Sequence, residues 1–315
     1  MNAAPEIAAT PAPGLSVVVP VFDSAGTLTE LVARLGSALD ALGRPYELIL
    51  VDDGSRDDSW AVISNLAGRY AWIRGIGLMR NYGQHNALLA GIRAARFDVT
   101  VTMDDDLQHR PETLAQVLAL LDGPCDVVYA TPEQKTNGFL RAVAGRITRL
   151  ALRSAVSAEV ARNVSAYRAF RTELRQAFSD YESPFVSVDV LLTWATTRFG
   201  ATRVRFDERL AGRSNYTVGK LLGHALDMMT GFSSKPLKFA SLVGFAFTIF
   251  GVAVLAYVLI RYFLEGSIPG FPFLASLISV FAGAQLFALG VIGEYLARMH
   301  FRSMKRPVYV VRNKT

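Results

Sequence analysis

Short apolar runs rich in β-branched residues alternate with amphipathic stretches along the first half of the chain. The apolar runs predict strands, and the stretches with apolar residues at helical spacing predict helices. We predict strands at 15–21, 46–51, 73–78, 99–103 and 126–129, with helices ending near Leu42, covering 57–69 and 84–96, and opening at Pro111. This alternation predicts an α/β fold with a mostly parallel sheet covered by helices on both faces. Ligands bind such sheets beyond the carboxyl ends of the strands.

Two long uncharged stretches follow in the last quarter of the chain. Residues 239–260 form a run of 22 residues without a charge. A helix of that length extends roughly 33 Å, which is enough for a hydrocarbon core of about 30 Å. The second stretch, 266–293, begins with a turn that contains two prolines. We predict two transmembrane helices at about 239–261 and 272–294; the alternative is a pair of buried helices in a large soluble core.

Basic residues flank the outer ends of this predicted hairpin. Lys235 and Lys238 precede it, and Arg298, Arg302, Lys305 and Arg306 follow it, whereas the connecting turn has only Arg261 at its edge. The positive-inside rule therefore places both termini and the large N-terminal part in the cytoplasm, on the inner (cell) membrane. Residues 1–14 have neither a basic region nor an apolar core, so we expect a disordered start and no signal peptide.

Composition agrees with a membrane protein. The charged fraction is 19% and the mean hydropathy is +0.27, whereas soluble domains carry about 25% charged residues. The formal charge of +6 indicates an anionic partner, which is a nucleic acid, a phosphorylated ligand or a membrane surface. Of these we expect a phosphorylated ligand and the lipid bilayer, and no nucleic acid. Cys125 is the single cysteine, which excludes an internal disulfide framework.

Carboxylates follow three of the predicted strands. Asp23 follows the first strand, Asp52 and Asp53 follow the second, and residues 104–106 (Asp-Asp-Asp) follow the fourth. Each cluster alone is explained equally well as a turn or a helix cap. Together at one sheet edge, however, they repel one another unless a cation or a ligand offsets their charge. Oxygen ligands of this kind favour Mg²⁺ or Mn²⁺ bound together with substrate phosphates, so we expect a diphosphate ligand.

The common nucleotide-binding motifs are missing. Gly75 and Gly77 are followed by Arg80 where a dinucleotide fingerprint has its third glycine, and no P-loop sequence is present. Neither a dehydrogenase nor a P-loop nucleotidase is therefore supported. The four histidines show no metal-ligand spacing, and we interpret them as solvent or core residues.

Five short motifs in a fixed order resemble glycosyltransferase family 2, and within it the polyprenyl-phosphate glycosyltransferases. They are VVVPVFD (17–23), DDGS (52–55), RNYGQHNA (80–87), DDDLQHRPE (104–112) and RLAGRSNY (209–216), and the tail from Gly293 is similar as well. Within the third motif, the run RNYGQH resembles most the members that load 4-deoxy-4-formamido-arabinose onto undecaprenyl phosphate; glucosyl-loading (bactoprenol) members share nearly everything else. The resemblance implies a GT-A type, Rossmann-like domain at 15–216 before the two spans.

The resemblance also implies roles for individual residues. A nucleotide site is implied at Pro20, Phe22, Asp23, Asp52, Asp53, Arg80, Asn81, Gln84 and Asp104, with the uracil held by Pro20, Phe22 and Asp53. Metal ligands are implied at Asp104, Asp106 and Gln108, and catalytic groups at Asp104, Asp106, Arg168 and Arg209. The acceptor phosphate is implied to meet Arg168, Arg209, Ser214 and Tyr216.

The expected reaction is inverting, metal-dependent transfer of a sugar from a nucleotide sugar, with UDP expected, to undecaprenyl phosphate. Two alternatives stay open. A processive polysaccharide synthase would require a Gln-x-x-Arg-Trp motif, which none of the three tryptophans provides. A non-catalytic membrane protein that only binds nucleotide sugars would keep its cellular function after Asp106→Asn. Association of copies through the small hairpin is a further expectation.

Two basic amphipathic segments are predicted to meet the membrane surface. Residues 139–156 carry four arginines among apolar residues at helical spacing, which is typical of an interfacial helix or of an ordinary surface helix. A second helix is predicted within 217–236, before the spans at 237–297 and a cytoplasmic tail at 298–315.

Overall fold

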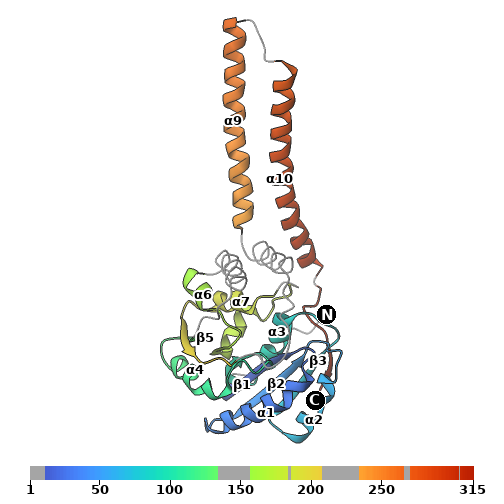
Figure 1. The fold of residues 1–315 in the computed structure, drawn as a ribbon, viewed down its shortest axis with the longest axis vertical. Helices are drawn as coiled ribbons and strands as arrows, with labels where there is room; N and C mark the ends of the chain where they lie inside the picture. Colours follow the sequence, from blue (N-terminus) through green and yellow to red (C-terminus); the bar gives the residue numbers. More distant parts are fainter. Residues whose placement is uncertain (1–10, 134–156, 184–185, 208–233, 266–269, 305) are drawn as a thin grey trace.

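The computed structural model describes residues 11–133, 157–183, 186–207, 234–265, 270–304 and 306–315. An α/β head carries a hairpin of two long helices (Figure 1). The predicted interfacial helix at 139–156 and most of the segment at 217–236 lie outside the described residues, as do residues 1–10.

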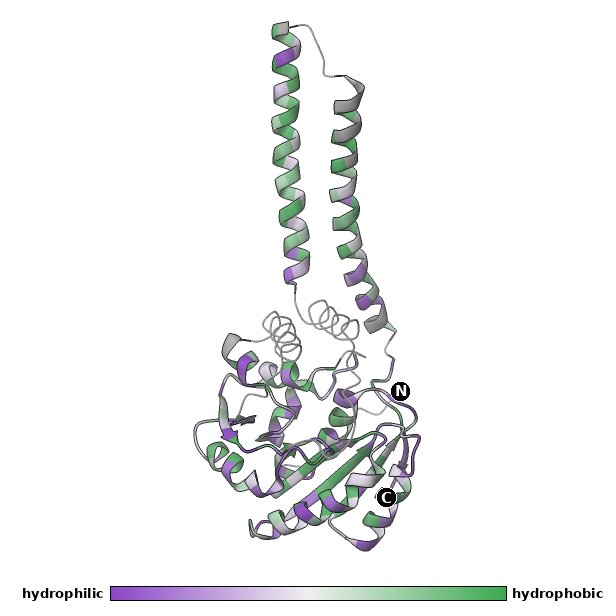
Figure 2. Ribbon diagram, in the orientation of Figure 1, coloured by the Kyte–Doolittle hydropathy of each residue, from purple (hydrophilic) through white to green (hydrophobic). Residues whose placement is uncertain are grey.

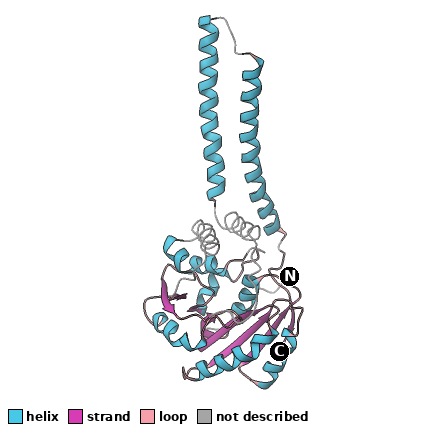
Figure 3. Ribbon diagram, viewed as in Figure 1, coloured by secondary structure: helices cyan, strands magenta, loops and turns pink. Residues whose placement is uncertain are grey.

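One eight-stranded sheet forms the centre of the head, with the order β7-β5-β6-β4-β1-β2-β3-β8 (Figure 3). The strands are β1 (Ala12–Val21), β2 (Tyr46–Asp52), β3 (Ile73–Leu78), β4 (Phe97–Thr102), β5 (Val127–Pro132), β6 (Arg168–Arg171), β7 (Phe199–Val204) and β8 (Val311–Lys314). Pairs β1–β2, β1–β4, β2–β3 and β5–β7 are parallel. Strand β6 is antiparallel to both β4 and β5, and β8 is antiparallel to β3. The predicted mostly parallel sheet is confirmed.

The helices of the head cover both faces of this sheet. They are α1 (Ala25–Asp40), α2 (Ser59–Arg69), α3 (Gln84–Ala94), η1 (Pro111–Thr113), α4 (Leu114–Leu121), α6 (Ala158–Asn163), η2 (Thr172–Phe178) and α7 (Val188–Ala195). Side chains alternate along a strand, so Val17 and Val19 of β1 pack with α1, α2 and α4, whereas Val18 packs with α3, α6 and α7. Strands with both faces buried read as continuous apolar runs, which is why the pattern predicted β1 to β5.

Two apolar helices follow the head, α9 (Lys235–Glu265) and α10 (Phe271–Ser303). Apolar residues occur all around both of them (Figure 2). Each contains a stretch long and apolar enough to cross a membrane, and none of that stretch is buried inside the protein. A buried pair of core helices is therefore excluded for these residues, and the helices suggest membrane anchoring. Both helices are longer than the predicted spans, because each continues beyond the uncharged stretch into flanking charged residues.

Asp126 joins the edge strand β7 to the rest of the sheet. Its side chain is buried and accepts hydrogen bonds from Thr196 Oγ1 at 2.5 Å and from the Nε and Nη2 atoms of Arg198 at 2.9 and 2.6 Å. The hydrogen bonds from Arg198, together with that from Thr196, lower the pKa of this carboxyl. The charged carboxylate therefore stabilises the fold above its unfolded pKa of about 4.

We expect Asp126→Asn to lower the free energy of unfolding by about 1–2 kcal/mol at pH 7, because charge-assisted hydrogen bonds are lost at a partly exposed pair. A depressed carboxyl pKa contributes stability that disappears as pH falls through the folded-state pKa. The difference between variant and parent should therefore shrink below about pH 4, as measured by urea denaturation across pH. A difference that stays constant down to pH 2 would contradict this assignment.

Candidate functional site

A cavity of about 260 Å³ lies where the strand order reverses, between β1 and β4. Such a switch point leaves a crevice at the carboxyl ends of the strands. The lining residues come from the ends of β1, β2 and β4 and from the loop after β3: Pro20, Val21, Phe22, Asp53, Asn81, Gly83, Gln84, Asp104, Asp105 and Asp106. The structure thus brings together six of the residues predicted to bind a nucleotide. Asp23, Asp52 and Arg80 lie next to the lining residues in the sequence but do not line the cavity.

Asp53 fixes the loop after β3. The Asp53 carboxylate accepts the N–H of Tyr82 at 2.7 Å and that of Gly83 at 2.8 Å, one on each oxygen. Burial raises its pKa, while these two backbone hydrogen bonds oppose the rise. Gly54 follows with φ +71, and a Cβ there would lie 2.6 Å from the backbone carbon of Arg80. The Asp53 carboxylate therefore holds this loop in place, and the close approach of Arg80 leaves no room for a side chain at position 54.

Asp23 and Asp52 shape the neighbouring loops. The Asp23 Oδ1 atom accepts the N–H of Arg56 at 2.7 Å, and the Asp23 N–H donates to Ser55 Oγ at 3.0 Å. Asp52 Oδ1 accepts the N–H of Ser55 at 3.2 Å, and burial raises the pKa of Asp52. Asp23 therefore connects the loops after β1 and β2, whereas Asp52 closes a turn within the loop after β2. Their predicted contact with a nucleotide stays a prediction.

The acidic loop after β4 is held in a tight turn. Leu107 has a left-handed backbone with φ 62, and Asp106 Oδ1 accepts the N–H of Gln108 at 3.1 Å. Gln84 Nε2 donates to Asp104 Oδ1 at 2.6 Å, which connects this loop to the start of α3. Asp105 lies between the two other carboxylates, and burial together with their charges raises its pKa to about 6. The loop therefore concentrates negative charge at the cavity.

His109 supports this turn from behind. Its ring is buried, and its Nδ1 accepts the Asp104 N–H at 3.0 Å. The imidazole packs against Tyr167 and Phe206, with ring centroids 5.4 and 4.9 Å away. Burial lowers the pKa of His109 to about 4, so the neutral ring is available as an acceptor. The interpretation as a core residue is confirmed, but its role at the loop was missed; its place five residues after Asp104 was the available signal.

The donor set of the acidic loop fits a divalent cation that is completed by a ligand. Among the residues that the structure describes, no group of three or more His, Cys, Asp or Glu side chains is arranged to hold a metal ion. Mg²⁺ and Mn²⁺ sites commonly use only one or two carboxylates and take the remaining oxygens from phosphates and water. Asp104 and Asp106 supply two carboxylates at the cavity, and the buried Oδ2 of Asp105 has no hydrogen-bond partner among the residues that the structure describes. Gln108 lies beside the loop and does not line the cavity.

Arg168 lies behind the cavity rather than in it. Its side chain is 2% exposed, whereas the family resemblance implied a guanidinium that faces a phosphate. It pairs with the buried carboxylate of Asp189, and its Nε donates to Thr102 Oγ1 at 3.0 Å. Tyr129 donates its hydroxyl to the same Asp189 oxygen at 3.0 Å. In this conformation the guanidinium contacts Asp189 and Thr102, and its predicted contact with the acceptor phosphate stays a prediction. Arg209, Ser214 and Tyr216 lie outside the described residues.

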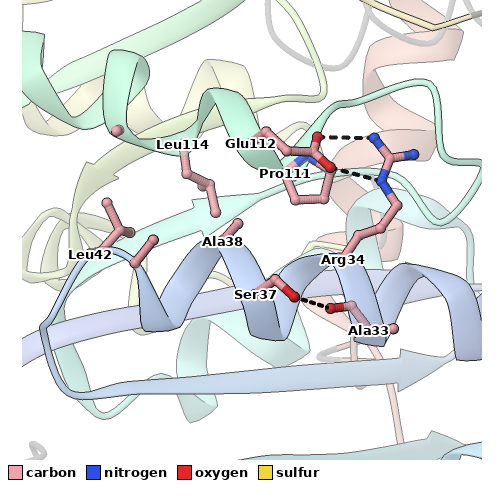
Figure 4. A pocket seen from close by; sticks show the side chains of 10 residues that line it. Ala33, Arg34, Ser37, Ala38, Leu42, Pro111, Glu112 and Leu114 are labelled. Atoms are coloured by element: carbon pink, nitrogen blue, oxygen red, sulfur yellow. Dashed lines mark hydrogen bonds and ion pairs between the residues drawn. The ribbon is translucent and has the colours of Figure 1, made fainter.

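A larger cavity, of about 530 Å³, lies between α1 and the η1–α4 segment (Figure 4). Its walls are mostly alanine and leucine, and its main polar feature is the ion pair of Arg34 and Glu112 at 2.9 Å. The two charged side chains of this cavity are therefore paired with each other. The smaller cavity, where carboxylates from separate strands converge, is the candidate site.

Solved structures share this fold. Glucosyl-3-phosphoglycerate synthase from Mycobacterium tuberculosis, solved with Mn²⁺, UDP and phosphoglyceric acid, superposes with a TM-score of 0.51 at 19% identity, covering 69% of this chain and 76% of the synthase. The head therefore has a GT-A type fold. Residues 16–180 match the family described as Glycosyl transferase family 2, and this chain belongs to that family. It is accordingly a glycosyltransferase.

Similarity to two bacterial relatives extends through the helical hairpin. The undecaprenyl-phosphate 4-deoxy-4-formamido-L-arabinose transferase of Shewanella sediminis is 31% identical over 303 residues, which cover 95% of this chain and 92% of the relative. The protein of the same name from Enterobacter sp. is 31% identical over 301 residues, covering 94% and 92%. The resemblance deduced from the motifs is thus confirmed.

Proposed function

We propose that this protein transfers a sugar from a UDP-sugar to undecaprenyl phosphate on the cytoplasmic side of the membrane, giving a lipid-linked sugar for modification of the cell envelope. The observation that carries the proposal is the convergence of carboxylates from separate strand ends on one cavity, in a head joined to an apolar hairpin. Similarity over nearly the whole chain to undecaprenyl-phosphate transferases supports the lipid acceptor. The basic residues around the hairpin support a cytoplasmic head.

The cavity residues suit a nucleotide diphosphate donor. Phe22 is 41% exposed beside the cavity, which leaves its ring available to a base. Asn81 and Gln84 also line the cavity with their amides, and Gln84 contacts Asp104 of the acidic loop. Asp104 and Asp106 would hold Mg²⁺ or Mn²⁺, which supplies positive charge opposite the leaving diphosphate. Without such charge, three neighbouring carboxylates would repel a diphosphate.

The acceptor needs no general base. A phosphate monoester has a second pKa of about 6 and is mostly dianionic at neutral pH. Its oxygen attacks the anomeric carbon while the bond from that carbon to the diphosphate oxygen breaks, and the electron pair leaves with UDP. A single displacement of this kind inverts the anomeric centre. The protein's task is then orientation and charge stabilisation, which is consistent with a cavity that has acidic and amide groups and a buried, neutral histidine behind it.

The test is a product assay with the full chain in detergent. Purified protein is incubated with undecaprenyl phosphate, Mn²⁺ or Mg²⁺ and a panel of UDP-sugars, and the lipid is weighed by mass spectrometry. We expect a lipid that has gained a single sugar, from one donor of the panel, and no product after chelation by EDTA. A long polymer would instead indicate a processive synthase, and donor binding without any product would indicate a binding protein.

A further inference from the structure

The segment that follows the second apolar helix returns to the head. Residues 306–315, called the tail below, run from the end of α10 to β8 at the edge of the sheet (Figure 1). Strand β8 pairs with β3 through Leu78 and Val311, Gly77 and Asn313, and Ile76 and Lys314. Thr315 closes the far end: its Oγ1 accepts the Gly75 N–H at 2.7 Å, and its N–H donates to the Gly75 oxygen at 3.1 Å. The tail thus supplies β8, the edge strand of the sheet on the side opposite to β7.

The other end of this pairing reaches the loop that lines the candidate site. The Met79 N–H donates to the Val310 oxygen at 2.9 Å, one residue beyond β3. Met79 begins the loop 79–83, which then passes over Gly54 and ends on the two oxygens of Asp53. Asn81 and Gly83 of this loop line the cavity. The loop is therefore fixed at its end by Asp53 and at its beginning by the tail.

Apolar packing joins the tail to the same loop. Val308 is 6% exposed and belongs to the hydrophobic cluster beneath α3. Tyr82 of the loop and Tyr309 of the tail both pack against that cluster. Tyr309 also lies under the guanidinium of Arg93 in α3, at 5.8 Å. The tail therefore contacts the head through side chains as well as through the backbone.

We propose that the tail is a positioning element for the donor pocket, through which the membrane hairpin and the nucleotide site are mechanically joined. It holds the loop 79–83 in the conformation that places Asn81 and Gly83 at the cavity, although no tail residue lines the cavity itself. A free loop would spend only part of its time in that conformation, and apparent affinity falls by the same fraction. The inference rests on the proposed function only in taking the ligand of this cavity to be a nucleoside diphosphate.

The test compares two substitutions of the same chemistry in the full chain. Val308→Asp places a charge in the buried cluster and should release the tail, whereas Val310→Asp, at a 39% exposed side chain, is the matched control. The first readout is hydrogen exchange at the amides of Met79, Tyr82 and Gly83. The second is the dissociation constant for UDP with Mn²⁺, together with the donor KM and the kcat at saturating donor. A chain that ends at Val310 removes β8 and serves as a second variant if Val308→Asp does not fold.

We expect Val308→Asp to speed exchange at all three amides and to weaken UDP binding about three- to tenfold, the range that one or two net hydrogen bonds support. The donor KM should rise in parallel with little change in kcat, and Val310→Asp should match the parent. Unchanged exchange at Tyr82 and Gly83 with a released tail, or equal UDP affinity in both variants, would overturn the inference. If the parent itself fails to bind UDP, the proposed donor is wrong, while faster exchange at Tyr82 and Gly83 would still support the coupling.

Discussion

Asp106→Asn is expected to reduce sugar transfer at least about 100-fold while the head stays folded. The substitution keeps a side-chain oxygen that accepts the Gln108 N–H, so the turn after β4 is preserved. It removes one negative charge from the pair that would hold the cation against the diphosphate. Interactions of this kind are worth several kcal/mol in the transition state, and about 2.7 kcal/mol corresponds to 100-fold. The measurement is kcat/KM for the lipid product, with a titration of Mn²⁺.

The matched control is Asp122→Asn, the same chemical change on an exposed carboxylate that pairs with Arg44 at 3.3 Å. It should leave transfer within about twofold of the parent, because exposed ion pairs contribute little. Both variants should have the melting temperature of the parent within about 2 °C, as expected for surface and loop changes that keep their hydrogen bonds. Full activity of Asp106→Asn at low Mn²⁺ would show that Asp106 does not hold the cation.

Arg168→Met is expected to lower the free energy of unfolding by about 3–5 kcal/mol, because it leaves a buried carboxylate without its cation. Asp189 would keep only the hydroxyl of Tyr129 among its named partners, and Thr102 would lose the Nε donor at the end of β4. Thermal denaturation of the full chain in detergent measures the loss, which corresponds to roughly 6–20 °C for a domain of this size. Transfer should fall as well, since the acidic loop begins two residues after Thr102.

The double variant Arg168→Met with Asp189→Leu separates charge from packing. Replacing a buried ion pair by apolar residues of similar volume is often close to neutral. The double variant should therefore recover more than half of the stability lost by Arg168→Met alone. A double variant as unstable as the single one would mean that Arg168 acts through its shape and its hydrogen bond to Thr102, not through the pair.

The parallel part of the sheet and its acidic edge could be predicted from the sequence because both follow from local pattern. Strands β1 to β5 are buried on both faces and therefore read as apolar runs, and the residue after each run falls at the same sheet edge. The later strands gave no such signal. β6 reads Arg-Ala-Phe-Arg and β8 reads Val-Arg-Asn-Lys, so their strand structure comes from partners far away in the sequence.

The same limit applies within the site. The motifs identified which acids and amides meet at the cavity, but not how each is held. The commitment of Asp53 to the N–H groups of Tyr82 and Gly83, and the support of Asp104 by His109, depend on a fold that brings these groups within 3.0 Å. Arg168 shows the converse: the family resemblance predicts a phosphate contact for this arginine, yet its buried partner Asp189 lies 21 residues away in the sequence, where no motif indicates the pairing.

The edge strand β8 is the last element of the head to be synthesised, after both apolar helices. Thr315 meets Gly75 across 240 residues of chain, and both apolar helices are synthesised between them. Domains generally begin to fold on the ribosome from the N-terminal side, but here the nascent head exposes an open β3 edge until the hairpin has left the ribosome. The sheet is thereby completed only after both apolar helices have been synthesised, so a polypeptide truncated before β8 would carry an unfinished sheet.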